Sequence, residues 1–199
     1  MQHDALRSLP VWLAFGALAT VRLANPRKLA ERIKQREPKA LGDLYEAYGR
    51  VVYSLIHRIV GDTAVAEDLT QETFLRVWNR FPAFDAETGA LGPWILAVAR
   101  GRAVDSLRSA RGRMPAPAEL DHPARFTGIG DPSLAPLRVQ HFREAFDKLP
   151  PAHKMLIELA YYEGLSVTEM AERTGQPSAD VNASLRTALQ SLRERSGTV

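Results

Sequence analysis

Hydrophobic residues recur at helical spacing along most of the chain, and we find neither the alternating pattern of strands nor an internal repeat. The first clear stripe predicts a helix that opens near Pro38 and ends at Gly61. It consists of Leu41, Leu44, Tyr45, Tyr48, Val52, Leu55, Ile56 and Ile59. We expect these residues to pack in a core and not to bind a cofactor.

A second amphipathic helix follows at once, with Asp62 as its N-cap and Pro82 as its stop. The residues predicted to face the core are Val65, Leu69, Thr73, Val77 and Phe81. The opposite face carries Glu67, Asp68, Gln71 and Glu72, with Phe74 and Trp78 near the boundary. The two helices should form an antiparallel hairpin. By periodicity alone the acidic face is simply solvated, as most charge runs are.

Residues 81–93 hold two prolines and two glycines without periodicity, which predicts a loop. Pro93 can open the next helix, predicted from Trp94 to Arg113. Its inward positions are Ile95, Ala99, Ala103 and Leu107. Its arginines, Arg100, Arg102, Arg108, Arg111 and Arg113, project elsewhere.

Residues 112–136 contain five prolines and three glycines, and no hydrophobic period survives there. We interpret this stretch as a flexible interdomain linker. Val139, Phe142, Phe146 and Leu149 begin a second domain, followed by a helix from about Pro151 to Glu163 that Gly164 ends. The fold class predicted is all-α, with two helical domains joined by the linker.

The second domain contains the spacing of a helix-turn-helix. Ser166 and Glu169 form a capping box that starts a short helix ending at Gly175. Ser178 then caps a last helix that carries Val181, Leu185, Leu189 and Leu192. Ala171 is small where two helices would approach, Gly175 allows a positive φ, and Val181 joins the helices. A generic helical hairpin is the alternative.

Charge is unevenly distributed, although the formal net charge is only +3. Residues 1–40 carry +5, residues 41–97 carry −4, residues 98–113 carry +4, residues 114–136 carry −2, and residues 137–199 are neutral. An acidic surface beside a concentrated basic stretch suggests two different partners, one of them a polyanion. The apolar run at 9–21 is too short to span a bilayer, so we expect an N-terminal helix there, or a mis-set translation start.

Little in the sequence indicates catalysis. There is no cysteine, and the five histidines show no ligand spacing. Glu67, Asp68 and Glu72 could chelate a metal, but the partner helix or histidine of such sites is missing. We see no nucleophile–base constellation and no glycine-rich phosphate loop. We therefore expect no enzyme activity, no cofactor, no metal and no small-molecule substrate.

The string AEDLTQETFLRVW at 66–78 closely resembles the segment with which sigma-70-family factors bind core RNA polymerase. The resemblance is to the small extracytoplasmic-function (ECF) sigma factors, and it covers about residues 29–113 and 137–195. It implies that Asp68, Gln71, Glu72 and Phe74 contact core polymerase.

The basic helix, PWILAVARGRAVDSLRSARGR, resembles the segment that reads the −10 promoter element, with Gly101 in place of a frequent Asn. The resemblance implies that the 81–93 loop holds a flipped base and that this site consists of Phe84, Trp94, Arg100, Arg102 and Arg108. An aromatic ring beside arginines also suits single-strand capture. The alternatives are a solvated basic face and a Trp94 that belongs to the core.

The string KLPPAHKMLIELAYYEGLSVTEMAERTG resembles the domain that reads the −35 element, which implies upstream DNA contacts by Ser178, Asn182 and Arg186. The recognition helix departs from the family pattern. Asn182 and Ser184 stand where basic residues are usual, and Asp180 adds a negative charge. Because phosphate contacts dominate DNA affinity, we expect weak upstream binding.

Together these features predict an ECF-type sigma factor that directs promoter-specific initiation in the cytoplasm, with core RNA polymerase, promoter DNA and an anti-sigma factor as partners. The expected divisions are an extension of unknown role at 1–28, a region 2-like domain at 29–111, the linker at 112–136 and a region 4-like domain at 137–199. One rival is a helix-turn-helix regulator that acts without core polymerase. The other is a metal-dependent carboxylate enzyme.

Overall fold

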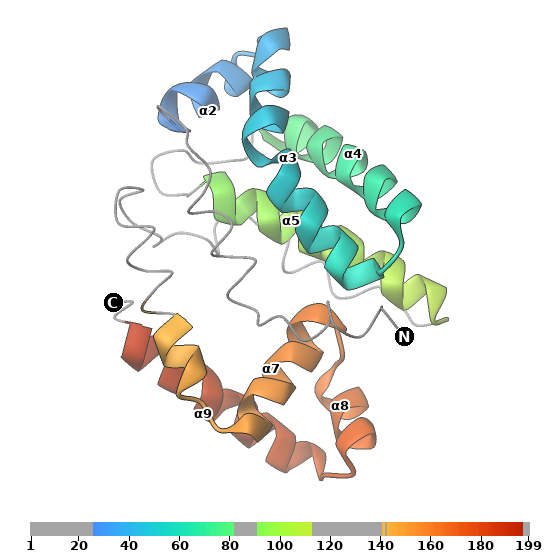
Figure 1. Cartoon of the computed structure of the whole chain (residues 1–199), viewed down its shortest axis with the longest axis vertical. Helices are drawn as coiled ribbons and strands as arrows, with labels where there is room; N and C mark the ends of the chain where they lie inside the picture. Colours follow the sequence, from blue (N-terminus) through green and yellow to red (C-terminus); the bar gives the residue numbers. More distant parts are fainter. Residues whose placement is uncertain (1–25, 82–90, 113–140, 142, 197–199) are drawn as a thin grey trace.

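The computed structural model describes residues 26–81, 91–112, 141 and 143–196, and within these ranges the regular structure is entirely helical. The helices are α2 (Pro26–Lys34), α3 (Pro38–Val60), α4 (Thr63–Arg80), α5 (Leu91–Ala110), α7 (Pro151–Tyr162), α8 (Val167–Thr174) and α9 (Ser178–Ser196). The all-α prediction is confirmed. Helices α2–α5 form one helical unit and α7–α9 form a second (Figure 1).

Local signals set the bounds of α3 and α4. Pro38 is the first residue of α3, and Gly61 ends it with φ 75°, donating its backbone N–H to the His57 carbonyl at 2.8 Å. Asp62 caps α4, because its carboxylate accepts the Val65 N–H at 2.9 Å. These caps were predicted from the sequence, and they turn the chain directly from α3 into α4.

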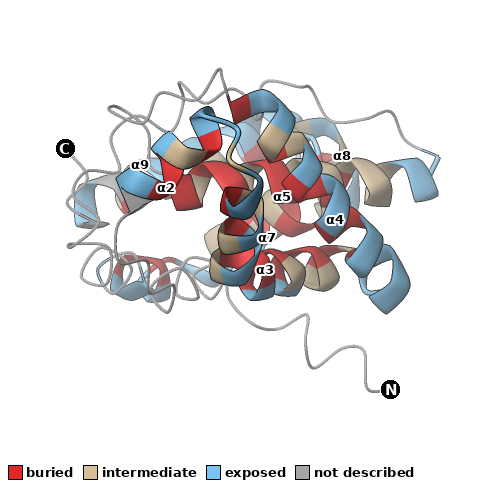
Figure 2. Cartoon of the chain, turned by 90° about the horizontal axis from the view of Figure 1, so that it is seen from above, coloured by how far each residue is buried: buried red, intermediate tan, exposed pale blue. Residues whose placement is uncertain are grey.

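The core of the first unit lies where α3, α4 and α5 pack against one another (Figure 2). Val52, Ile56, Val77, Ile95 and Ala99 are completely buried there. Thr70 and Thr73 are also buried, and each hydroxyl donates to the carbonyl four residues earlier, at 2.7 Å. The inward face of α4 is therefore satisfied in both packing and hydrogen bonding.

Three residues predicted to be inward are exposed instead. Tyr45 is 49% exposed, Val65 38% and Leu189 58%. In α9 the inward position beside Leu189 belongs to Ala188, which is fully buried. Each of the three lies at the margin of its helical stripe, where the packed neighbour and not the spacing decides which side chain is covered.

The bounds of α5 also differ from the prediction. The helix begins at Leu91 and ends at Ala110, not at Trp94 and Arg113. Leu91 and Gly92 are buried, so packing extends the helix backward through residues predicted as loop. Pro93 is tolerated because the N–H groups of a first helical turn have no intrahelical acceptor.

The second unit is built around the predicted helix-turn-helix. The Ser166–Glu169 capping box opens α8, and Gly175 ends it at φ 68°. Met170, Ala171 and Val181 share a small core with Leu156, Leu159 and Leu165. Pro177, not Ser178, caps α9, because its carbonyl accepts the Val181 N–H. The helix-turn-helix prediction is confirmed.

The larger hydrophobic cluster runs through both units. It contains Phe146, Leu149, Ile157, Tyr162, Ala188 and Leu192 together with the core of α3–α5. The predictions for residues 9–21, for the loop at 82–90, for the linker beyond Gly112, and for Val139 and Phe142 fall outside the described residues. Within the described ranges, no helix has the length and apolar content needed to cross a membrane.

Candidate protein and nucleic-acid interfaces

The outer face of α4 is an acidic, solvent-exposed strip. Glu67, Asp68, Gln71 and Glu72 are all exposed, as the spacing predicted. Leu75 continues this strip and is 56% exposed, which places an apolar side chain beside the charges. Periodicity gave no reason to select Leu75, although a large exposed apolar residue is the usual signal of a contact surface. No three His, Asp or Glu side chains in the described ranges gather as metal ligands.

Phe74 does not share this outward face. It is 3% exposed, and its ring lies 4.9 Å from the ring of Tyr45 on α3 at an interplanar angle of 57°. The prediction that Phe74 points outward with Asp68 and Gln71 is therefore wrong. Phe74 fixes α4 against α3, since burial of an aromatic ring contributes more to packing than an exposed ring can.

Trp94 belongs to the core, the second of the two alternatives. Its side chain is fully buried and lies edge-on to Phe81, with 5.7 Å between ring centroids. Phe84, the other aromatic residue predicted at this site, lies outside the described residues. The aromatic part of the predicted single-strand site is thus not presented by α5 itself.

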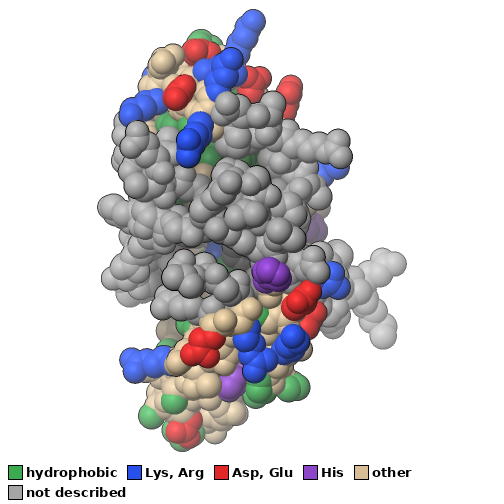
Figure 3. Space-filling view, turned by 90° about the vertical axis from the view of Figure 1, so that its left-hand side faces the viewer, with side chains coloured by type: hydrophobic (Ala, Val, Ile, Leu, Met, Phe, Trp, Pro, Cys, Tyr) green, Lys and Arg blue, Asp and Glu red, His purple; other side chains and the backbone are tan. Residues whose placement is uncertain are grey.

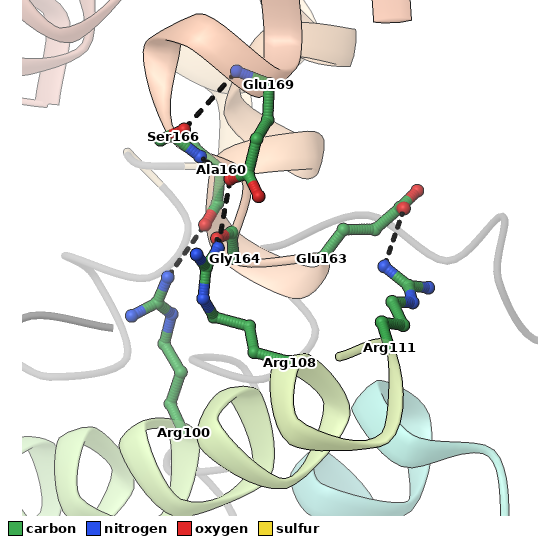
Figure 4. Close-up of polar contacts among 8 residues, drawn as sticks. All are labelled: Arg100, Arg108, Arg111, Ala160, Glu163, Gly164, Ser166 and Glu169. Atoms are coloured by element: carbon green, nitrogen blue, oxygen red, sulfur yellow. Dashed lines mark hydrogen bonds and ion pairs between the residues drawn. The ribbon is translucent and has the colours of Figure 1, made fainter. Parts of the chain in front are cut away.

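The three predicted −10 arginines of α5 point in two directions. Arg102 reaches α4 and pairs with Glu72, with 2.5 Å between its Nη2 atom and Oε2. Arg100 and Arg108 reach the second unit, at the end of α7 (Figure 4). The pairing of Arg102 with Glu72 joins the acidic strip of α4 to the basic face of α5.

Arg100 binds the last turn of α7. It donates to the Tyr161 carbonyl at 2.9 Å and to the Ala160 carbonyl at 2.8 Å, and its guanidinium lies over the Tyr161 ring at 4.7 Å. Burial lowers the pKa of Arg100, while the nearby Tyr161 acts in the opposite direction. The group stays charged, since an ordinary arginine pKa is far above neutral pH.

Arg108 binds the segment between α7 and α8. It donates to the Gly164 carbonyl at 2.7 Å and to the Glu169 carboxylate at 3.0 Å (Figure 4). Arg111 adds a looser pair with Glu163 at 3.4 Å. Sequence reasoning missed this use of the arginines, because it joins residues more than fifty positions apart.

The predicted upstream site lies on the exposed face of α9. Ser178, Asn182 and Arg186 are all exposed, and so is Asp180, whereas Ser184 is half-buried. Charges of both signs lie close together on the described surface of the face in Figure 3. A helix with one arginine and one aspartate among these positions offers DNA little net charge.

Two family models match the chain within these units. Sigma-70 region 2 matches residues 44–113, and sigma-70 region 4 matches residues 140–192. Among curated relatives, the ECF RNA polymerase sigma factor SigK of Mycobacterium tuberculosis is 31% identical over 170 residues, covering 83% of this chain and 90% of the relative. BldN of Streptomyces coelicolor is 32% identical over 171 residues, covering 85% and 65%.

The chain therefore belongs to the sigma-70 family, and within it to the ECF RNA polymerase sigma factors. A similar solved structure is that of Rhodobacter sphaeroides SigE in complex with the anti-sigma ChrR. It is 26% identical, covers 84% of this chain and 95% of that chain, and has a TM-score of 0.44.

Proposed function

We propose that this chain binds core RNA polymerase through the exposed strip of α4 and directs it to promoters through α5 and α9. The observation that carries the proposal is the position of the two sigma-70 regions. Region 2 contains the acidic strip and the basic helix, and region 4 contains the helix-turn-helix. In this role the chain performs no chemistry and supplies specificity to an enzyme.

The polymerase contact is assigned to Asp68, Gln71, Glu72 and the neighbouring Leu75. Their exposure and mixed polar and apolar character suit a protein partner. Phe74 supports this surface from beneath by fixing the position of α4.

The downstream DNA contact is assigned to Arg100, Arg102 and Arg108, with Phe84 as a further proposed residue. Guanidinium groups pair bidentately with phosphate, which suits a strand that passes along α5. Trp94 supports the helix from the core. Upstream contacts are assigned to Ser178, Asn182 and Arg186, and family membership adds a cytoplasmic location and an anti-sigma factor as a further partner.

Charge reversal at Asp68 tests the polymerase contact. Asp68→Lys should weaken binding of core polymerase by about tenfold, which corresponds to about 1.4 kcal/mol, because it places a positive charge in an acidic interface. Glu46→Lys makes the same change at an exposed acid of α3 and is the matched control. Binding is measured by fluorescence anisotropy of labelled chain, and run-off transcription on a genomic fragment library should fall in parallel.

Equal binding of core polymerase by Asp68→Lys and wild type would move the contact away from α4. A wild-type chain that binds DNA but never core polymerase would favour a helix-turn-helix regulator that acts alone.

A further inference from the structure

The arginines proposed to contact promoter DNA already have partners in the second unit. Arg100 occupies two carbonyl groups in the last turn of α7, and Arg108 occupies the Gly164 carbonyl and the Glu169 carboxylate (Figure 4). The side chain of Arg108 is only 13% exposed in this arrangement. Neither guanidinium is available to a phosphate while these bonds persist.

The end of α7 presents the chemistry of an anion to these arginines. The last four carbonyl groups of a helix have no intrahelical donor, and the helix dipole places partial negative charge there. The carbonyl oxygens of Ala160, Tyr161 and Gly164 lie at this end, with the carboxylates of Glu163 and Glu169 beside them. Forked guanidinium groups bind such a surface as they would bind phosphate oxygens.

Gly164 permits the close approach. Its φ is 61°, in the left-handed region that favours glycine. A Cβ atom at this position would lie 2.3 Å from Cγ1 of Val104 on α5. No larger residue fits, so the backbone after α7 rests directly on α5 between Arg100 and Arg108.

Two aromatic rings add to the contact. Arg58 of α3 lies over the Tyr162 ring at 4.2 Å, and Arg100 lies over the neighbouring Tyr161. Tyr162 and Ile157 also join the hydrophobic cluster of α3–α5. The contact therefore combines apolar burial, cation–π stacking and charged hydrogen bonds.

We infer that the free chain closes on itself, with the end of α7 and its following turn acting as an internal substitute for promoter DNA on Arg100 and Arg108. This inference rests on the proposed function, because it requires that these arginines contact DNA. DNA and the second unit then exclude each other from α5. By linkage, any partner that binds only the open chain, such as polymerase with its promoter, must open this contact.

An engineered disulfide tests closure directly, because the chain has no cysteine of its own. An ideal Cβ on Gly164 lies 3.4 Å from Cβ of Val104, close to the separation of about 3.8 Å found in disulfides. The test variant is Val104→Cys with Gly164→Cys. The matched control is Val104→Cys with Gly175→Cys, because Gly175 also has a positive φ of 68° but no atom within 4 Å of its Cβ position.

The free test variant should cross-link on mild oxidation, and the control should not. With core polymerase and a promoter fragment selected by the wild-type holoenzyme, the oxidised variant should form at least about tenfold fewer promoter complexes, a loss of about 1.4 kcal/mol. Reduction should restore them. Equal promoter binding by the oxidised and reduced forms would overturn the inference, and so would a free variant that folds by circular dichroism but does not cross-link.

A second pair of variants avoids any strain at Gly164. Glu163→Gln with Glu169→Gln removes the two carboxylates that face α5, and glutamine still completes the capping box of α8. Glu172→Gln with Glu194→Gln removes the same charge at exposed sites of the same unit. The first pair should bind a fluorescent 20-nucleotide single strand several-fold more tightly than the second pair.

Equal affinity in the two pairs would count against closure, since bulk charge would then explain the gain. The proposed function fails separately, if the wild-type and reduced chains form no promoter complex with core polymerase. That result would remove the basis of this inference as well.

Discussion

Glu169 serves two helices at once. Its carboxylate accepts the Ser166 backbone N–H at 2.7 Å, which opens α8, and it accepts from Arg108 of α5. Burial alone would raise the pKa of Glu169, but the hydrogen bonds from Ser166 and Arg108 outweigh burial and lower the pKa to about 2. A single carboxylate thus links the helix-turn-helix to the basic helix.

This lowered pKa predicts a dependence of stability on pH. A carboxyl whose folded pKa is depressed stabilises the fold above its ordinary pKa of 4.5, and the stabilisation is lost as the pH falls toward about 2. The melting temperature of wild type should therefore exceed that of Glu169→Gln at pH 6, and the two should converge near pH 2. Thermal melts followed by circular dichroism measure this.

Glu172→Gln, at an exposed position of the same helix, is the control and should follow wild type throughout. A constant difference between Glu169→Gln and wild type over the whole pH range would show that the carboxylate charge does not carry the stabilisation.

At the scale of the element, α9 is well placed but weakly charged for DNA. The helix-turn-helix core of Met170, Ala171 and Val181 holds it firmly against α8. Its exposed face nevertheless presents Asp180 and Asn182 near Arg186. Geometry and charge therefore point to different strengths of upstream binding, and charge governs affinity for phosphates.

Restoring charge on α9 should strengthen upstream binding. Asn182→Lys together with Ser184→Arg should raise the affinity of the holoenzyme for promoter DNA, and each new phosphate contact should steepen the salt slope by about 0.9. Thr187→Lys adds charge at an exposed position on another side of α9 and should have a smaller effect. Binding titrations across a range of salt concentrations give both numbers. If Thr187→Lys matches the double variant, Asn182 does not face DNA.

At the scale of the whole molecule, the two units compete with DNA for one helix. Arg102 pairs only across the first unit with the exposed Glu72, while Arg100 and Arg108 are held by the second unit. The three arginines should therefore behave differently in the free chain and alike in the holoenzyme.

This difference can be measured from salt slopes of single-strand binding. In the free chain Arg102→Ala should reduce the slope by about 0.7, whereas Arg100→Ala should not reduce it. In the holoenzyme on promoter DNA both substitutions should reduce it. A reduction by Arg100→Ala in the free chain would mean that this arginine is already available to DNA.

Much of this organisation follows from the sequence. Asp62, Gly61, Gly175 and the Ser166–Glu169 box were each predicted correctly, because caps and turns depend on residues within one helical turn. The stripes also identified the helices and the acidic strip of α4. Sequence determined these because a 3.6-residue period is a local property that survives into the fold.

Only the tertiary structure decided where the marginal and long side chains go. Phe74 and Trp94 became core, and Tyr45 and Leu189 became exposed, because the neighbouring helix and not the period decides what is covered at the edge of a stripe. Arg100 meets a carbonyl 61 residues away. A long charged side chain can reach water, a partner or its own chain, and its sequence neighbours do not determine which of these it meets.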